Sequence, residues 1–116
     1  MDAEALREVF APFAPVHIRS MFGGHGVYVG DLCFAVQVKG ELFLKGDDET
    51  LVAFESAGCA RWTYDSTGKT TRMPYWRMPA SAFDDSDELV RWCHLACAAA
   101  QRRARQKLKK SPRRPR

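Results

Sequence analysis

Hydrophobic residues recur at helical spacing near both ends of the chain. Over residues 3–11 apolar side chains fall three or four positions apart, which predicts an amphipathic helix capped by Asp2 and ended by Pro12. A shorter helix is predicted over 49–57, and a long one from about Asp85. The apolar stripe of the long helix is expected at Leu89, Trp92, Cys93, Ala96 and Ala100, with Ala104 and Leu108 as its extension.

Between the first two helices the pattern changes to the alternation typical of half-buried strands. Strands are predicted over 16–22, 27–29, 32–38 and 41–45. In 32–38 the even-numbered residues are expected on one face of the strand and the odd-numbered residues on the other. A flexible turn is predicted at the glycine-rich segment 23–26. The connections are short, which favours an antiparallel meander over βαβ units.

A second hairpin is predicted from strands over 59–65 and 71–77. Pro74 interrupts the latter, so this strand is expected either at a sheet edge or at a bulge. Residues 79–83 read as a loop or a short 3₁₀ turn. The resulting order is α-β4-α-β2-α. It predicts an α+β fold with two layers, in which helices cover one face of an antiparallel sheet.

Charge divides the chain into two parts. The 18 Lys and Arg residues are split equally between residues 1–100 and 101–116, and all 14 Asp and Glu residues lie in the first part. We therefore predict one acidic globular domain over 1–100 and a basic tail over 101–116. The long helix is expected to continue into the tail to about Lys109, with disorder after Pro112.

The basic tail is a candidate for contact with nucleic acid. Each phosphate that it neutralised would release counterions and add to the salt dependence of binding, and the absence of aromatic residues argues for sequence-independent contact. The alternative is a solvated terminus, or one that docks on the acidic domain of a neighbouring molecule. The candidate contacts are Arg102, Arg103, Arg105, Lys107, Lys109, Lys110, Arg113, Arg114 and Arg116.

Cysteine usage and hydropathy favour a cytoplasmic protein. The acidic start is no secretory signal, and no apolar stretch approaches the ~20 residues that cross a bilayer, so no membrane contact is expected. The four cysteines are expected to be reduced and to pack as small hydrophobic residues. A metal site that joins Cys93 and Cys97 to His94 or His25 is the weaker alternative. We expect no metal and no cofactor.

Several separated segments carry a family resemblance. Residues 18–29 read IRSMFGGHGVYV, and matching segments follow in order at Phe34-Ala35, 42–45, Ala57-Gly58, Tyr64, Gly68-Lys69, Met73, Tyr75-Trp76 and Pro79. Together they resemble the TfoX/Sxy N-terminal domain family over roughly residues 5–100. The resemblance implies a bacterial protein, a fold similar to type III secretion chaperones and no known catalytic residue. Full-length regulators of this kind carry a second, C-terminal domain, where this chain has its basic tail.

The resemblance also implies a regulatory function. Family members are associated with the regulation of natural competence genes, and the better-understood ones assist a transcription activator, the cyclic-AMP receptor protein. We therefore expect a non-enzymatic interaction module with a protein partner. The alternatives are a general nucleic-acid-binding protein that uses the tail, and a small-molecule or metal-dependent enzyme that uses residues 19–26.

The glycine-rich segment is the first candidate contact site in the domain. Its glycines permit close approach of a backbone, and nearby basic side chains suit an anion. The segment leads into a strand rather than a helix, so the alternative is a bulged hairpin with a structural role only. The candidate contact residues are Arg19, Met21, Phe22, Gly23, Gly24, His25 and Gly26.

The aromatic segment over 73–79 is the second candidate. Neighbouring residues of a strand face opposite sides, so Trp76 is expected outward if Tyr75 faces inward, with Arg77 beside it. An exposed tryptophan next to an arginine is typical of an interaction hot spot, and two such edges could form a homodimer. The other interpretation places the Trp76 ring in the core, beneath the C-terminal helix.

Overall fold

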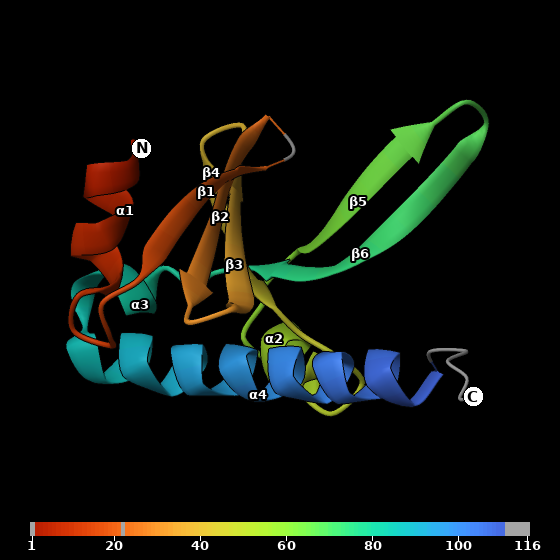
Figure 1. Ribbon diagram of the computed structural model, residues 1–116. Helices are drawn as coiled ribbons and strands as arrows, with labels where there is room; N and C mark the ends of the chain where they lie inside the picture. The colour runs from red at the N-terminus through yellow and green to blue at the C-terminus, as the bar shows by residue number, and fades with distance from the viewer. Residues whose placement is uncertain (1, 22, 111–116) are drawn as a thin grey trace.

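Six strands form one antiparallel sheet in the computed structural model, and the longest helix runs along one of its faces (Figure 1). The structure describes residues 2–21 and 23–110. The helices are α1 (Ala3–Phe10), α2 (Leu51–Ser56), α3 (Ser81–Asp84) and α4 (Ser86–Lys110). The strands are β1 (His17–Met21), β2 (Gly24–Val29), β3 (Leu32–Val38), β4 (Glu41–Lys45), β5 (Arg61–Ser66) and β6 (Lys69–Arg77). The predicted α+β class and order are confirmed, with the short α3 in place of the loop expected over 79–83.

The strand order is β1-β2-β3-β4-β6-β5, so β6 lies inside the sheet. The prediction that Pro74 marks an edge strand is therefore wrong, and the alternative of a bulge is correct. Arg61 of β5 pairs with Trp76 of β6, but Thr63, two residues further on, pairs with Arg72. Pro74 therefore lies in a bulge of β6 between these two pairs. Proline lacks the N–H that a regular ladder needs, and there the Pro74 carbonyl accepts a hydrogen bond from the Gly46 N–H at 3.0 Å.

The turn predicted over residues 23–26 is shorter than expected. Met21 of β1 already pairs with Gly24 of β2, so Gly24, His25 and Gly26 belong to the strand. Gly23 has a φ of +74°, a left-handed conformation that suits glycine at a tight turn. Gly24 and Gly26 therefore belong to a hydrogen-bonded strand rather than to a loop.

A bulge in β3 breaks the alternation expected over residues 32–38. Val27 pairs with Ala35 and Tyr28 with Cys33, which leaves Phe34 as the extra residue. Phe34 and Ala35 consequently both belong to the main core, between the sheet and the helices. Cys33 instead packs with a second hydrophobic cluster that contains Val36. The strict alternation predicted for this strand is wrong at this point.

Aromatic rings fill the main core between the sheet and the helices. Phe54 of α2 stacks on Trp76 of β6, with 5.5 Å between ring centroids and 8° between ring planes, and also contacts Trp92 of α4 at 5.0 Å. All five residues of the predicted stripe on α4 are buried. Leu108, expected to extend the stripe, is 72% exposed. The basic end of α4 thus continues past the apolar surface that the helix covers.

An ion pair fastens α4 to the loop that leads into α2. Arg102 Nε lies 2.6 Å from Asp47 Oδ2, and Arg102 Nη2 lies 3.0 Å from Asp47 Oδ1. Asp47 Oδ1 also accepts a hydrogen bond from the Thr50 N–H at 3.2 Å, so the same carboxylate orders the loop. The Arg102 hydrogen bond lowers the pKa of the Asp47 carboxyl.

Replacing Asp47 with Asn should lower stability in a pH-dependent way. The pKa of Asp47 is lower in the folded chain, so its stabilising effect is complete above the ordinary value of about 4 and is lost as pH falls through the folded value. We expect Asp47→Asn to lower the free energy of unfolding by about 1 kcal/mol at pH 7 and by less near pH 2. Urea denaturation at several pH values measures this, with Asp48→Asn as control. An effect of equal size at both pH values would contradict the assignment.

Candidate interaction surface

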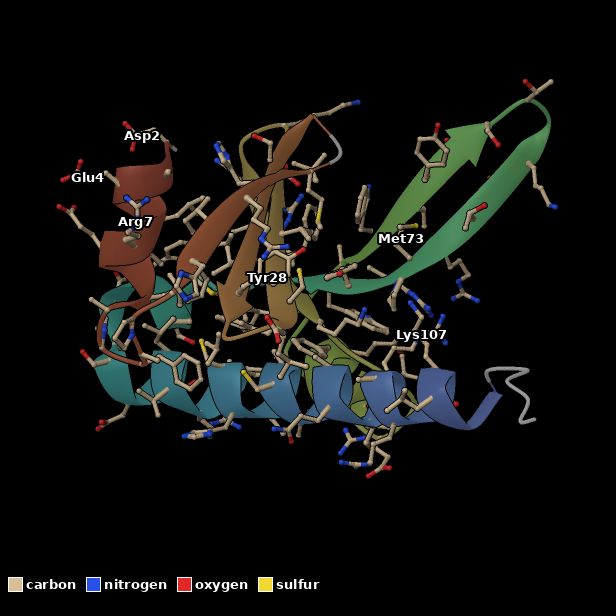
Figure 2. The ribbon with its side chains drawn as sticks, viewed as in Figure 1. Asp2, Glu4, Arg7, Tyr28, Met73 and Lys107 are labelled. Atoms are coloured by element: carbon tan, nitrogen blue, oxygen red, sulfur yellow. The ribbon has the colours of Figure 1, made fainter. Side chains whose placement is uncertain are left out.

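The face of the sheet opposite α4 carries a separate hydrophobic cluster, and we call this side the outer face. Val36, Phe43 and Tyr75 are buried at its centre. Five partly buried residues surround them: Met21, Cys33, Val38, Trp62 and Met73. These residues come from both halves of the sheet, and Figure 2 shows Tyr28 on the strands of the first half and Met73 on the hairpin of the second. The outer face is therefore a surface that only the folded chain assembles.

The β5–β6 hairpin extends beyond the rest of the sheet as a two-stranded arm (Figure 1). β4 pairs with β6 only at residues 75–77, so nearly all of the arm lies past this junction. A groove of about 740 Å³ lies between the arm and the end of β3. It is lined by Val38, Lys39, Trp62, Thr63, Tyr64, Asp65 and Met73. Tyr64 is 56% exposed, although large aromatic side chains gain free energy on burial.

Aromatic stacking and two cations organise the outer face. Trp62 stacks on Phe43 at 5.7 Å between centroids, and Tyr75 lies 6.0 Å from Trp62. Lys45 Nζ lies 4.7 Å from the centre of the Tyr75 ring, and the Arg19 guanidinium lies 4.9 Å from that of Tyr28. Burial raises the pKa of the Tyr75 hydroxyl, which therefore stays protonated. The surface suits an apolar partner segment with acidic groups beside it.

The structure separates the candidate residues of the glycine-rich segment. Arg19 pairs with Gly26, and Met21 packs with the cluster of the outer face. His25 instead pairs with Ser20, and its Nδ1 lies 2.9 Å from Oε1 of Gln37. Gly24 lies against the Gln37 carbonyl, where a Cβ would collide with the backbone. Phe22 lies outside the described residues.

The two aromatic neighbours on β6 do face opposite sides, but both are buried. Trp76 is 1% exposed in the main core, so the interpretation as core is correct and the expectation of an exposed Trp76 ring is wrong. Tyr75 lies on the outer face and is 7% exposed, because Trp62 and Lys45 cover it. Arg77 is exposed and pairs with Glu41 at 2.6 Å.

The most accessible apolar residues of the outer face were missed as candidates. Trp62, Tyr64 and Val38 line the groove, and none of them was among the candidate contact residues. The available signal was the shared face of Trp62 and Tyr64 in the predicted hairpin. That signal alone does not show that the end of β3 forms the opposite wall.

The candidate cations of α4 also divide into groups. Arg102 is held by Asp47 and Glu49, so a phosphate at Arg102 would compete with these carboxylates, and its contact with nucleic acid stays a prediction. Arg103 lines a pocket with Lys45 and Arg61, and Asp47, Asp48 and Glu49 form its acidic side. Arg105 is exposed on α4. Lys109 and Lys110 belong to α4 without described side chains, and Arg113, Arg114 and Arg116 lie outside the described residues.

Lys45 is where the outer face meets the basic part of α4. Burial lowers its pKa most, and the charges of Arg103 and Lys107 lower it further, against an opposing effect of Cys33. Arg103 and Lys107 are four residues apart and so lie on the same side of α4. Lys45 and Arg103 line one pocket, Lys107 lies on the same side of α4 as Arg103, and a phosphate bound there would meet these cations beside the carboxylates of that pocket.

The thiols have the properties of packing groups. Burial raises the pKa of Cys93 to about 12 and that of Cys97 to about 11, so neither is a nucleophilic thiolate at neutral pH. His94 packs edge-on against Phe13 at 5.3 Å. Within residues 2–21 and 23–110, no group of three His, Cys, Asp or Glu side chains is placed to hold a metal ion. In the same part of the chain, every helix is too short or too polar to cross a membrane.

Comparison with known proteins gives the family of this chain. The profile described as the TfoX N-terminal domain matches residues 8–100. The chain belongs to the TfoX N-terminal domain family. It is 27% identical to Protein Sxy of Escherichia coli (strain K12) over 111 residues, which cover 91% of this chain and 53% of Sxy. It is 39% identical to DNA transformation protein TfoX1 of Aliivibrio fischeri (strain ATCC 700601 / ES114) over 46 residues, which cover 40% of this chain and 22% of TfoX1.

These matches confirm the resemblance inferred from the sequence. The chain is TfoX/Sxy-like and similar to competence regulators. It spans about half the length of Sxy, so the matched region of that relative corresponds to the α+β domain described here. The glycine-rich segment and the aromatic strand β6 both lie within the family match.

Two glycine variants test the structural role of the glycine-rich segment. Gly24→Ala should lower the free energy of unfolding by about 1–3 kcal/mol, because the added methyl group meets the Gln37 backbone. Gly26→Ala is the matched control, since its methyl group would meet the flexible end of Met21 at 2.9 Å and the Tyr28 ring at 3.1 Å. Thermal denaturation measures both. A loss in Gly26→Ala equal to that in Gly24→Ala would contradict this view of the strand.

Proposed function

We propose that this chain is a non-enzymatic regulatory module that binds a protein partner on the outer face of its sheet. The groove beside the arm carries the proposal. It combines apolar side chains with an exposed aromatic ring, and the burial of such a ring supplies much of the free energy of association at protein interfaces. The rim holds charged groups of both signs, Lys39 and Asp65, which suit recognition of one partner orientation.

The chemistry of the remaining polar groups supports binding rather than catalysis. Burial raises the pKa of the Cys93 and Cys97 thiols, and the His25 ring is held by the amide side chain of Gln37. One of the two relatives is named a DNA transformation protein. These observations favour an activity exerted through another macromolecule.

The partner we propose is a bacterial transcription activator in the cytoplasm. TfoX1 is named a DNA transformation protein, and the family resemblance implies a link to natural competence genes. The family resemblance implies the cyclic-AMP receptor protein as the activator to examine first. The Arg19 guanidinium at the rim of the outer face would meet acidic side chains of that partner.

Disruption of the groove should weaken binding to the activator. We expect Tyr64→Glu to lower the affinity for purified cyclic-AMP receptor protein at least ten-fold, because a carboxylate replaces the exposed ring of the groove. Isothermal titration calorimetry provides the measurement. Val52→Glu is the matched control, because Val52 is 70% exposed on α2, away from the groove. Equal affinities of the two variants, or no binding by the wild type, would contradict the proposal.

A second function is supported by the convergence of Lys45, Arg103 and Lys107. Among the described residues, the ion pairs of the molecule leave these three cations without a carboxylate partner within 4.0 Å. Contact with nucleic-acid phosphates would neutralise them. Such contact would hold the module near DNA while the outer face binds its protein partner.

Charge reversal on α4 tests this contact. The double variant Arg103→Glu/Lys107→Glu should bind a random DNA duplex more weakly and reduce the slope of log K against log salt by about 1.8, which corresponds to two phosphates. Arg105→Glu is the single-site control, since it lies about 200° around the helix from Arg103. Fluorescence anisotropy over a salt series gives both slopes. An unchanged slope in the double variant would exclude these residues as phosphate contacts.

A further inference from the structure

The free edge of β5 exposes backbone groups that can pair with another strand. β5 is the last strand of the sheet, and four of its six residues are exposed. The Ala60 carbonyl accepts a hydrogen bond from the Arg77 N–H at 2.8 Å, so residue 60 is directed toward β6. Backbone direction alternates along an antiparallel strand, so Arg61, Thr63 and Asp65 direct their N–H and C=O groups away from β6.

We propose that β5 pairs antiparallel with β5 of a second copy, about a twofold axis at Thr63. The two six-stranded sheets would then form one continuous sheet. In this register Thr63 lies opposite itself, Arg61 lies opposite Asp65 of the second copy, and Trp62 lies opposite Tyr64 of the second copy. The occupant of the edge is thus a second copy of this chain.

Charge complementarity selects this register and this edge. The twofold axis brings two Arg–Asp pairs together, one on each side of Thr63. Within one copy, Arg61 Nε donates to the Met73 carbonyl at 2.8 Å and Asp65 accepts from the Thr70 hydroxyl at 2.8 Å, so each side chain would turn from β6 to meet its partner across the axis. The opposite edge of the sheet lacks this property, since β1 paired with itself about its midpoint would place Arg19 opposite Arg19.

The same register covers exposed apolar surface. Tyr64 is 56% exposed and shares the outer side of the arm with Trp62, which stacks on Phe43. Pairing about Thr63 brings Tyr64 of the second copy next to Trp62, and by symmetry the first Tyr64 next to the second Trp62. Unpaired edges with exposed aromatic residues are sites of strand addition, which natural proteins either protect or use.

Sedimentation velocity with a proline variant tests the pairing. We expect the wild type to change from monomer to dimer between about 1 and 100 μM, as a small interface predicts. Thr63→Pro removes an N–H that points away from β6, so the variant should keep the fold and remain monomeric at about 100 μM. Thr63→Val is the matched control and should dimerise as the wild type does. A monomeric wild type, or a dimeric folded Thr63→Pro, would overturn the proposal.

A cysteine pair gives a second measurement that does not depend on the proline. Residues opposite each other in a hydrogen-bonded antiparallel pair have Cα atoms about 5.5 Å apart, a separation that a disulfide spans. Thr63→Cys should therefore form a covalent dimer under mild oxidation, whereas Ser66→Cys, three positions from the axis, should not. Both variants keep the native Cys33, Cys59, Cys93 and Cys97, so only the difference between them reports on the register. Equal crosslinking of the two variants would overturn the proposed axis.

Self-pairing and the proposed function have separable outcomes. Thr63→Pro leaves the side chains of Trp62, Tyr64 and Met73 in place on the outer face. If the variant is monomeric and still binds the activator, the pairing is supported and activator binding does not require it. If the wild type binds the activator but never dimerises, the pairing is overturned and the proposed function stands.

Discussion

Three residues of β6 attach the arm to the rest of the sheet, and the central one, Trp76, anchors the attachment. Its ring stacks on Phe54 in the core, and the Arg61 guanidinium lies 4.5 Å from its centre on the arm side. Gly46 leaves space for the ring, since a Cβ there would lie 2.6 Å from it. The buried indole N–H of Trp76 has no hydrogen-bond acceptor among the residues that the structure describes, and the stacking on Phe54 and the Arg61 contact help to offset its desolvation. The groove, the free edge of β5 and the approach of Lys45 to α4 all depend on this junction.

The two faces of the sheet have different roles because only one is closed by the long helix. The helical side buries the larger cluster and supplies most of the apolar burial. The outer face buries only three residues at its centre and leaves a rim of partly buried side chains. A sheet covered on one side can use its second side for binding while the first side maintains the fold.

Local patterns in the sequence predicted the elements, while the relations between distant elements required the structure. The apolar stripe of α4 and the short connections of β1–β4 depend on neighbours within a few residues, and both were predicted. The place of β6 between β4 and β5 depends on the burial of Trp76 against α2, and no local signal reports it. The bulge at Phe34 likewise arises from pairing with β2.

For the candidate site, too, the sequence predicted local features but not the contacts between distant elements. The glycine and aromatic segments were found, but their residues are shared between the two faces of the sheet. The groove was missed because Val38 and Tyr64 are 26 positions apart in the printed sequence. Arg102 looked like any other tail cation until the fold placed it against Asp47. Periodicity indicates which face a residue occupies within one strand, but it does not show what lies across from that face.

The interruption at Pro74 has a consequence for how this architecture can diversify. It separates the ladder that holds β6 to β4 from the ladder that runs to the hairpin tip at residues 67–68. Residues inserted symmetrically at the tip would lengthen the ribbon without shifting Trp76 or the pairs at its base. The length of the hairpin and its exposed side chains can therefore change during evolution while the core keeps its composition. Domains of this architecture can differ most in this single hairpin.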